Sequence, residues 1–185
     1  MNINGSTTDF RLCGWLNLYY GALKRTAYKW LNIAQMCELL LPSTSYDIRK
    51  IYYCTAAVSG TPDDPDKPQR QLKYIRALKT LPTIQIVQGK FITERITLQR
   101  ADMSGPVEVI RPKEKQSDVN LVSCLFWDAC RGNFDTAVIV SGDSDFYTPV
   151  KMIRNHYMKN IGVLDPQRHG TPTSPMNREA NFYWN

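Results

Sequence analysis

Apolar and polar residues follow one another along the chain in two kinds of pattern, one typical of helices and the other typical of strands. Apolar residues at helical spacing predict helices over residues 30–42, 69–82, 117–132 and 145–158. Runs rich in β-branched and aromatic residues predict strands over residues 48–60, 136–142 and 160–166. Strands that alternate with helices imply an α/β fold, a three-layer α/β/α sandwich with a mainly parallel central sheet.

The middle of the chain departs from this alternation. Residues 83–93 predict a strand that breaks at Gly89, and residues 94–99 and 107–112 predict short edge strands around a turn at Gly105. We therefore expect a β-rich insertion between the helices over 69–82 and 117–132.

A buried strand is predicted to end at two carboxylates. The apolar run 136–142 leads directly into Asp143 and Asp145, and a buried carboxylate must be solvated, cap a helix or be neutralised by a cation. The two side chains can converge if the turn is tight, and hard carboxylate oxygens suit magnesium or manganese. The alternative is structural: Asp143 or Ser144 caps the next helix and Asp145 stabilises its first turn.

A third acid favours the first interpretation. Asp118 begins the helix over 117–132, and a right-handed crossover starts that helix at the edge of the sheet from which Asp143 projects. Ligands of such sheets bind beyond the carboxyl ends of the strands, where the strand order reverses. Asp118 can also serve as a helix cap, and Glu114 as a surface charge.

Several segments occur together in a characteristic order. They are "NLYYGALK" with "YKWL", "YYCTAAVSGTPDDP", "RQLKYIRALKTLP", "EKQSDVNL", "DACRGNFDTAVIVSGDSDF" and "IGVLDP". The combination resembles the NYN domain family of the PIN-like ribonuclease superfamily over roughly residues 17–166. The resemblance implies a PIN-like, Rossmann-like fold and a metal-dependent hydrolase of RNA phosphodiesters. By motif match, its acidic positions fall on Asp118, Asp143 and Asp145, and its first polar position falls on Asn17.

The first motif departs from the family pattern. Members usually reach this motif through an apolar strand that ends in the aspartate of DGxN, whereas this chain has "FRLCGWLN" and places Gly14 or Cys13 at the acidic position. Neither residue supplies a hard anionic oxygen. Either the site is degraded or residues 1–16, an atypical first strand, are altered. We expect one domain over 1–166 and a turn-rich tail over 167–185.

Composition narrows the class of protein. The chain has 185 residues, of which 43% are apolar, and this is enough for one domain with a core. The five cysteines, an odd number without zinc-ligand spacing, predict buried free thiols. No apolar run is long enough to span a membrane and no signal peptide is evident, so we expect a cytoplasmic protein without membrane partners. The net charge of +6 is a weak indication of an anionic partner.

The leading hypothesis is a Mg²⁺- or Mn²⁺-dependent endoribonuclease that acts on single-stranded RNA. Asp118, Asp143 and Asp145 would hold the metal, and Asn17 would complete the catalytic set. RNA phosphate contacts are expected at the rim from Lys115, Arg131 and Lys151, which can equally be solvated surface charges.

Other functions stay in competition with this hypothesis. Loss of the first acid would leave an impaired enzyme or a catalytically inactive RNA-binding or interaction protein, in which Tyr19, Tyr20 or Trp15 stack on bases. A phosphatase or glycosyltransferase that uses residues 143–145 is less favoured, since only 40 residues follow Asp145. A homo-oligomer is among the expected states.

Overall fold

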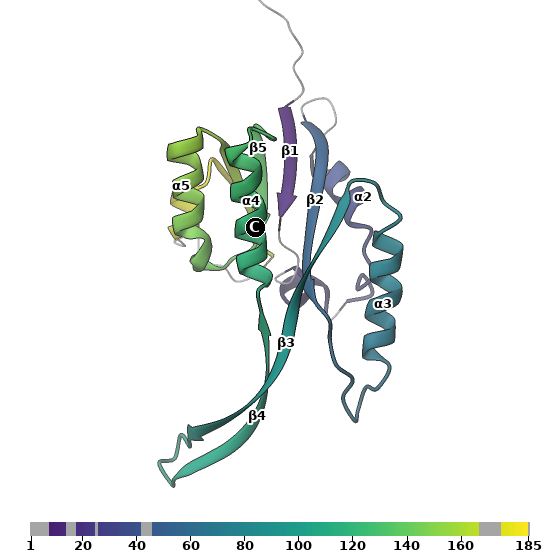
Figure 1. Ribbon diagram of the computed structural model, residues 1–185, viewed down its shortest axis with the longest axis vertical. Coiled ribbons are helices and arrows are strands. Elements are labelled where there is room, and N and C mark those ends of the chain that lie inside the picture. The colour runs from purple at the N-terminus through teal and green to yellow at the C-terminus, as the bar shows by residue number, and fades with distance from the viewer. Residues whose placement is uncertain (1–7, 14–17, 25, 42–45, 167–174, 185) are drawn as a thin grey trace, which may run out of the picture.

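The fold is that of a computed structural model, which describes residues 8–13, 18–24, 26–41, 46–166 and 175–184. Within these ranges the strands form one seven-stranded sheet in the order β4-β3-β2-β1-β5-β6-β7 (Figure 1). The strands are β1 (Thr8–Cys13), β2 (Tyr46–Ala56), β3 (Ile84–Gln99), β4 (Pro106–Lys115), β5 (Thr136–Val140), β6 (Asn160–Leu164) and β7 (Phe182–Trp184). Neighbouring strands are parallel except β3 and β4, which are antiparallel.

Helices cover both faces of the sheet. They are η1 (Tyr19–Leu23), α2 (Ile33–Leu40), α3 (Lys67–Leu78), α4 (Ser117–Cys130), η2 (Ser144–Phe146), α5 (Tyr147–Tyr157) and α6 (Pro175–Glu179). In Figure 1, α2 and α3 lie on one side of the sheet and α4 and α5 on the other. The predicted three-layer α/β/α sandwich is therefore confirmed. None of the helices described is long and apolar enough to cross a membrane.

Alternate side chains of the central strands enter two separate cores. In β5, Ala137 and Ile139 pack in the core beneath α4 and α5, whereas Val138 and Val140 pack in the core beneath α2 and α3. All five residues of β5 are buried. This two-sided burial explains why the sequence of β5 is continuously apolar, as expected for a parallel strand covered on both faces.

A long β-hairpin replaces the predicted short edge strands. β3 runs without interruption through Gly89: residues 84–89 pair with β2, and residues 90–99 pair with β4 in an arm that extends from the body (Figure 1). The prediction of a break at Gly89 was wrong. Glycine is required there for another reason, because an added Cβ would lie 2.6 Å from the carbonyl oxygen of Lys115 and 2.8 Å from Ser117 Oγ.

The C-terminal segment packs on the sheet beyond residue 166, where the domain was expected to end. β7 pairs with β6 at the edge of the sheet, and Met176 of α6 is fully buried in the core with α5. The predicted tail over 167–185 therefore contains a helix and a strand. The reason is its apolar and aromatic side chains, which bury surface against β6 and α5.

The described cysteines are free, as predicted, but not uniformly buried. Cys37 and Cys54 are buried, and burial is the main cause that raises the pKa of each thiol to about 12. Cys124 is partly buried and Cys130 is exposed at the end of α4. The buried thiols are thus unreactive packing groups.

Candidate active site

The order of the strands in the sheet reverses its direction at β1. The chain places β2 on one side of β1 and β5 on the other, and Cys13, the last residue of β1, pairs with Tyr52 and Ile139. The helices that follow these strands depart in opposite directions, so the carboxyl edge at this point is where α/β proteins bind ligands. Asn17, which was predicted to complete the catalytic set, and Gly14, one of the two residues at the position of the missing first acid, lie outside the described residues.

The loop after β5 is held in a tight turn by local hydrogen bonds. The backbone N–H of Asp145 donates to Asp143 Oδ1 at 2.9 Å, and the N–H of Asp143 donates to Ser141 Oγ at 3.1 Å. The cap predicted as the structural role of Asp143 therefore exists. It uses one carboxylate oxygen, so it is compatible with a ligand on the other.

The same loop packs closely on the end of β6. A Cβ added at Gly142 would overlap the carboxyl group of Asp165, which is buried. Tyr183 of β7 donates its hydroxyl to Asp165 Oδ2 at 2.8 Å. Asp165 thus supports the loop that carries Asp143. The sequence did not indicate this role, although Asp165 lies in "IGVLDP", one of the segments that resemble the family.

Asp118 lies in the first turn of α4 and interacts electrostatically with the loop after β5. Its side chain is exposed, yet nearby atoms remove part of its hydration, and this is the main cause of its raised pKa. The negative charges of Asp143 and Asp145 raise the pKa further. The structure therefore brings the three predicted acids from two separate elements within electrostatic reach of one another.

Glu114, which the sequence suggested to be a surface charge, is a fourth carboxyl group at this edge. It precedes α4, accepts a hydrogen bond from the Ser117 hydroxyl, and has a buried Oε2 without a hydrogen-bond partner among the described residues. Burial raises its pKa, the Ser117 hydrogen bond opposes this, and the charge of Asp118 raises it further. Its place four residues before Asp118 in "EKQSDVNL" was the available signal.

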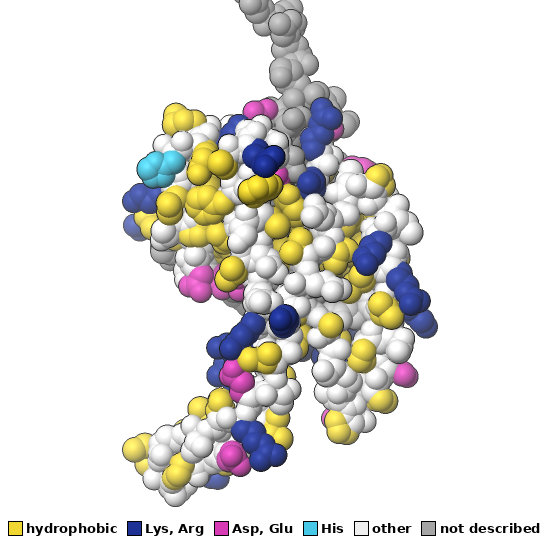
Figure 2. All heavy atoms as spheres, viewed as in Figure 1, with side chains coloured by type: hydrophobic (Ala, Val, Ile, Leu, Met, Phe, Trp, Pro, Cys, Tyr) yellow, Lys and Arg dark blue, Asp and Glu magenta, His cyan; other side chains and the backbone are white. Residues whose placement is uncertain are grey.

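The three predicted RNA contacts lie in different places. Lys115 ends β4 next to Glu114, with its Nζ 3.2 Å from Glu94 Oε1, and Figure 2 shows basic side chains at this base of the hairpin. Lys151 lies on α5, the helix that follows Asp145, with its Nζ 5.8 Å from the Tyr147 ring centroid. Arg131 follows the far end of α4, so the structure does not bring it together with the acids.

A pocket of about 580 Å³ lies on the α3 side of the sheet. We call it the ring-lined pocket. Its aromatic members are Tyr19, Tyr20, Trp30, Tyr53, Tyr74 and Phe91, and its basic members are Lys24, Lys29, Lys67 and Arg70. The residues come from η1, the segment before α2, the end of β2, α3 and β3. Sequence reasoning had considered Tyr19 and Tyr20 but not the other rings.

Comparison with known proteins identifies the family. The NYN domain matches residues 17–184. This chain belongs to the NYN domain family. The match confirms the predicted resemblance and places the chain in a PIN-like family of the nuclease type.

Two further proteins are similar to this NYN domain. One is 6-hydroxy-3-succinoylpyridine 3-monooxygenase HspA from Pseudomonas putida (strain DSM 28022 / S16), which is 31% identical over 191 residues; the match covers 89% of this chain and 59% of HspA. The chain thus spans about three fifths of that relative's length. The other is a crystal structure of a protein of unknown function from Vibrio parahaemolyticus RIMD 2210633, with a TM-score of 0.59, 20% identity, and coverage of 100% of this chain and 95% of that chain. This second likeness concerns the fold alone.

Proposed function

We propose that this NYN domain is a Mg²⁺- or Mn²⁺-dependent endoribonuclease that hydrolyses phosphodiester bonds of single-stranded RNA. The observation that supports it is the electrostatic coupling of Asp118 with Asp143 and Asp145 at the switch point of the sheet. A carboxylate whose pKa is raised by neighbouring negative charges, as that of Asp118 is, costs stability and is typical of sites where a positive charge binds.

The residues present fit a divalent cation in their chemistry. All four acids offer hard oxygens. Glu114 Oε2, which is buried and has no hydrogen-bond partner among the described residues, adds negative charge to the same edge. Among the residues described, no three side chains of His, Cys, Asp or Glu are close enough to hold a metal ion on their own. Magnesium does not require such a cage, since it keeps several waters and uses one or two carboxylates together with substrate phosphates.

The roles of the side chains follow from their positions. One or two of Asp118, Asp143 and Asp145 would hold the cation directly and the others through its bound waters; when bound, the cation would polarise the phosphoryl oxygen and activate a water. The Asp143 cap and the support from Asp165 hold the loop so that its carboxylates stay at the edge. Lys115, which ends β4 next to Glu114, would contact an RNA phosphate. Such chemistry needs no histidine, which suits a chain that has only two, His156 and His169.

The experiment measures cleavage of a labelled single-stranded RNA with Mg²⁺ or Mn²⁺ and with EDTA. We expect metal-dependent cleavage that falls on the order of 100-fold in Asp143→Asn, because the reacting groups lose their placement. Asp135→Asn is the matched control, since Asp135 is exposed at the opposite edge of the sheet beside Lys159. A folded protein that binds RNA without cleaving it would support instead the inactive RNA-binding alternative, with the missing first acid as the reason.

A second candidate function comes from the Pseudomonas relative, whose name describes a monooxygenase acting on 6-hydroxy-3-succinoylpyridine. The ring-lined pocket favours this candidate, because aromatic rings and lysines suit an aromatic acid. The chain spans only part of that relative, so the whole reaction is not transferred to it. Calorimetric titration with 6-hydroxy-3-succinoylpyridine tests this candidate, and no heat of binding would remove it.

A further inference from the structure

We call the four acids Glu114, Asp118, Asp143 and Asp145 the acid edge. The ring-lined pocket interacts electrostatically with one of them, Glu114. Its wall includes Thr55 and Ala56 at the end of β2 and Phe91 just beyond Gly89 of β3. Burial is the main cause of the raised pKa of both Tyr20 and Tyr53, and the negative charge of Glu114 contributes to each. Phe91, which lines the pocket, also pairs with Glu114 across the hairpin, so the pocket and Glu114 meet at the base of the hairpin.

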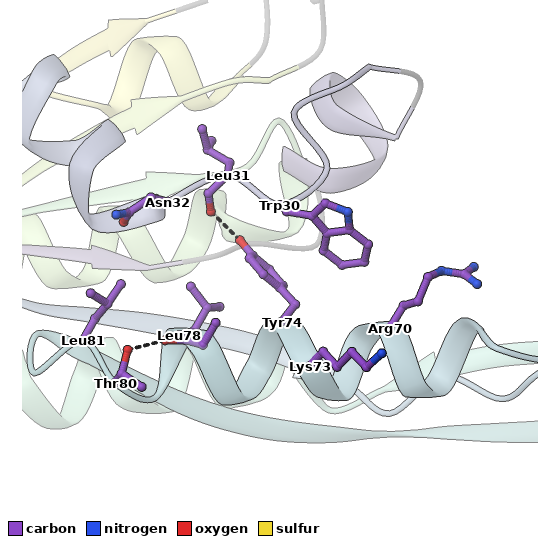
Figure 3. Close-up of a pocket in the computed structure, with 10 residues that line it drawn as sticks. Trp30, Leu31, Asn32, Arg70, Lys73, Tyr74, Leu78, Thr80 and Leu81 are labelled. Carbon is purple, nitrogen blue, oxygen red and sulfur yellow. Dashed lines mark hydrogen bonds between the residues drawn. The ribbon is translucent and has the colours of Figure 1, made fainter.

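Two aromatic rings of the pocket are unusually exposed. Trp30 has 54% and Tyr20 has 48% of its surface accessible. Trp30 is nevertheless held in place, since its ring centroid lies 5.5 Å from that of Tyr74. The Tyr74 hydroxyl in turn donates a hydrogen bond to the carbonyl of Leu31 at 2.7 Å (Figure 3). A large ring that is both positioned and exposed is suited to stacking on a flat ligand.

The charge of the pocket selects an anion. Lys24, Lys29 and Lys67 line it, and among the described residues none of the three forms an ion pair with a carboxylate. Arg70 is engaged with Asp64, the acidic member of the lining, at 2.5 Å. The pocket therefore has three lysines without an ion pair among the described residues, of which Lys24 has its Nζ 5.1 Å from the centroid of the exposed Tyr20 ring. Positive charge beside exposed rings is a combination that binds nucleic-acid backbone and bases together.

The remaining polar groups have little capacity to read a base edge. Gln71 accepts a hydrogen bond from the N–H of Val58 at 2.9 Å and donates to the carbonyl of Ala56 at 2.8 Å. Ring planes and positive charge are thus the recognition elements that stay available.

We propose that the ring-lined pocket binds one nucleotide of a single-stranded RNA, with the base against Trp30 and Tyr20 and the phosphate near the lysines. The proposal rests on the proposed function, since it takes RNA as the ligand. A volume of about 580 Å³ is adequate for one nucleotide. Recognition by stacking makes binding largely independent of base identity, because every base offers a π-face.

The experiment uses fluorescence anisotropy in EDTA, in the Asp143→Asn background, so that no RNA is cleaved. Two probes of equal length are compared: a single-stranded RNA and an oligomer that has the same backbone without bases. Trp30→Ala should weaken RNA binding by roughly 5- to 150-fold and leave the abasic oligomer nearly unaffected. Lys29→Gln should weaken both and reduce the logarithmic salt dependence by about 0.7.

Two further variants serve as controls. Trp127→Ala removes a tryptophan that is 59% exposed near the far end of α4, beneath Arg131, and should leave both probes unchanged. Trp30→Phe retains a ring and should keep most of the affinity, which separates stacking from loss of folding.

Several outcomes would overturn the proposal. These are unchanged RNA binding by Trp30→Ala, equal losses for the two probes, or binding of 6-hydroxy-3-succinoylpyridine that depends on Trp30 while RNA binding does not. Cleavage plays no part in the measurement. If the unmodified chain cleaves no RNA but binding depends on Trp30, hydrolysis fails as a function and the nucleotide pocket stands.

Discussion

Gly89→Ala tests whether the close contact between β3 and the start of α4 positions the acids. An added Cβ would lie 2.6 Å from the carbonyl oxygen of Lys115, 2.8 Å from Ser117 Oγ and 3.2 Å from Ser117 N. Two of these three atoms belong to the backbone, so the segment that joins β4 to α4 must move. Overpacking costs about 1–3 kcal/mol, whereas replacing glycine in the unfolded chain returns about 0.4–1 kcal/mol. The free energy of unfolding should fall by about 1–2 kcal/mol and Tm by roughly 2–8 °C.

A control variant separates the effect of this contact from a general loss of stability. Gly132→Ala is the matched control: Gly132 has φ +67° and open space around it, so alanine there costs about 1–2 kcal/mol through backbone strain alone. Thermal unfolding of both variants is followed by circular dichroism, once in EDTA and once in Mg²⁺. Only Gly89→Ala should reduce the rise in Tm that Mg²⁺ produces, because it displaces Glu114 and Asp118. A Gly89→Ala protein as stable as the parent would refute the reasoning.

Two other substitutions examine the carboxyl groups. At neutral pH in EDTA, Asp118→Asn should raise Tm. The pKa of Asp118 in the folded protein is above its ordinary value of 3.8. Stability is therefore lost as pH rises from the ordinary pKa through the raised one, because the ionised carboxylate destabilises the fold. The advantage should vanish below about pH 4, and a lower Tm at neutral pH would contradict it. Tyr52→Phe removes a 2.6 Å hydrogen bond to buried Asp128 and should cost about 1.5–3 kcal/mol; an unchanged midpoint in urea would show that this bond contributes nothing.

Local sequence was sufficient to predict the elements that carry the acids. The apolar run of β5 leaves no polar face, so it predicts a strand buried on both sides, and the following Asp143 and Asp145 must then lie at its carboxyl end. The helical spacing of apolar residues after Asp118 likewise predicts α4. The acid edge could thus be predicted from periodicity and chain order, without knowledge of distant contacts.

Long-range pairing explains what could not be predicted. The hairpin depends on the register that pairs Lys90 with Lys115, and a glycine within a strand reads as a break when the approaching backbone is unknown. Glu114 reads as a surface charge because its burial comes from α4 and the hairpin base. The ring-lined pocket draws on five separate segments, so no local pattern contains it. β7 is short and its partner is β6, which made the tail resemble a loop.

The two proposed sites lie on opposite faces of the sheet, and in the proposed function this arrangement would divide the work of catalysis. The acids extend from α4 and the loop before η2, whereas the pocket lies between η1 and α3. Stacking of a base in the pocket would change little during phosphoryl transfer, so the pocket would contribute binding that is similar in the ground state and the transition state. The negative charge that develops at the phosphate would be stabilised by the cation that the acids hold, not by the pocket. A chain that lacks the first acid can therefore lose turnover while it retains RNA affinity, because the groups responsible for each belong to different faces of the fold.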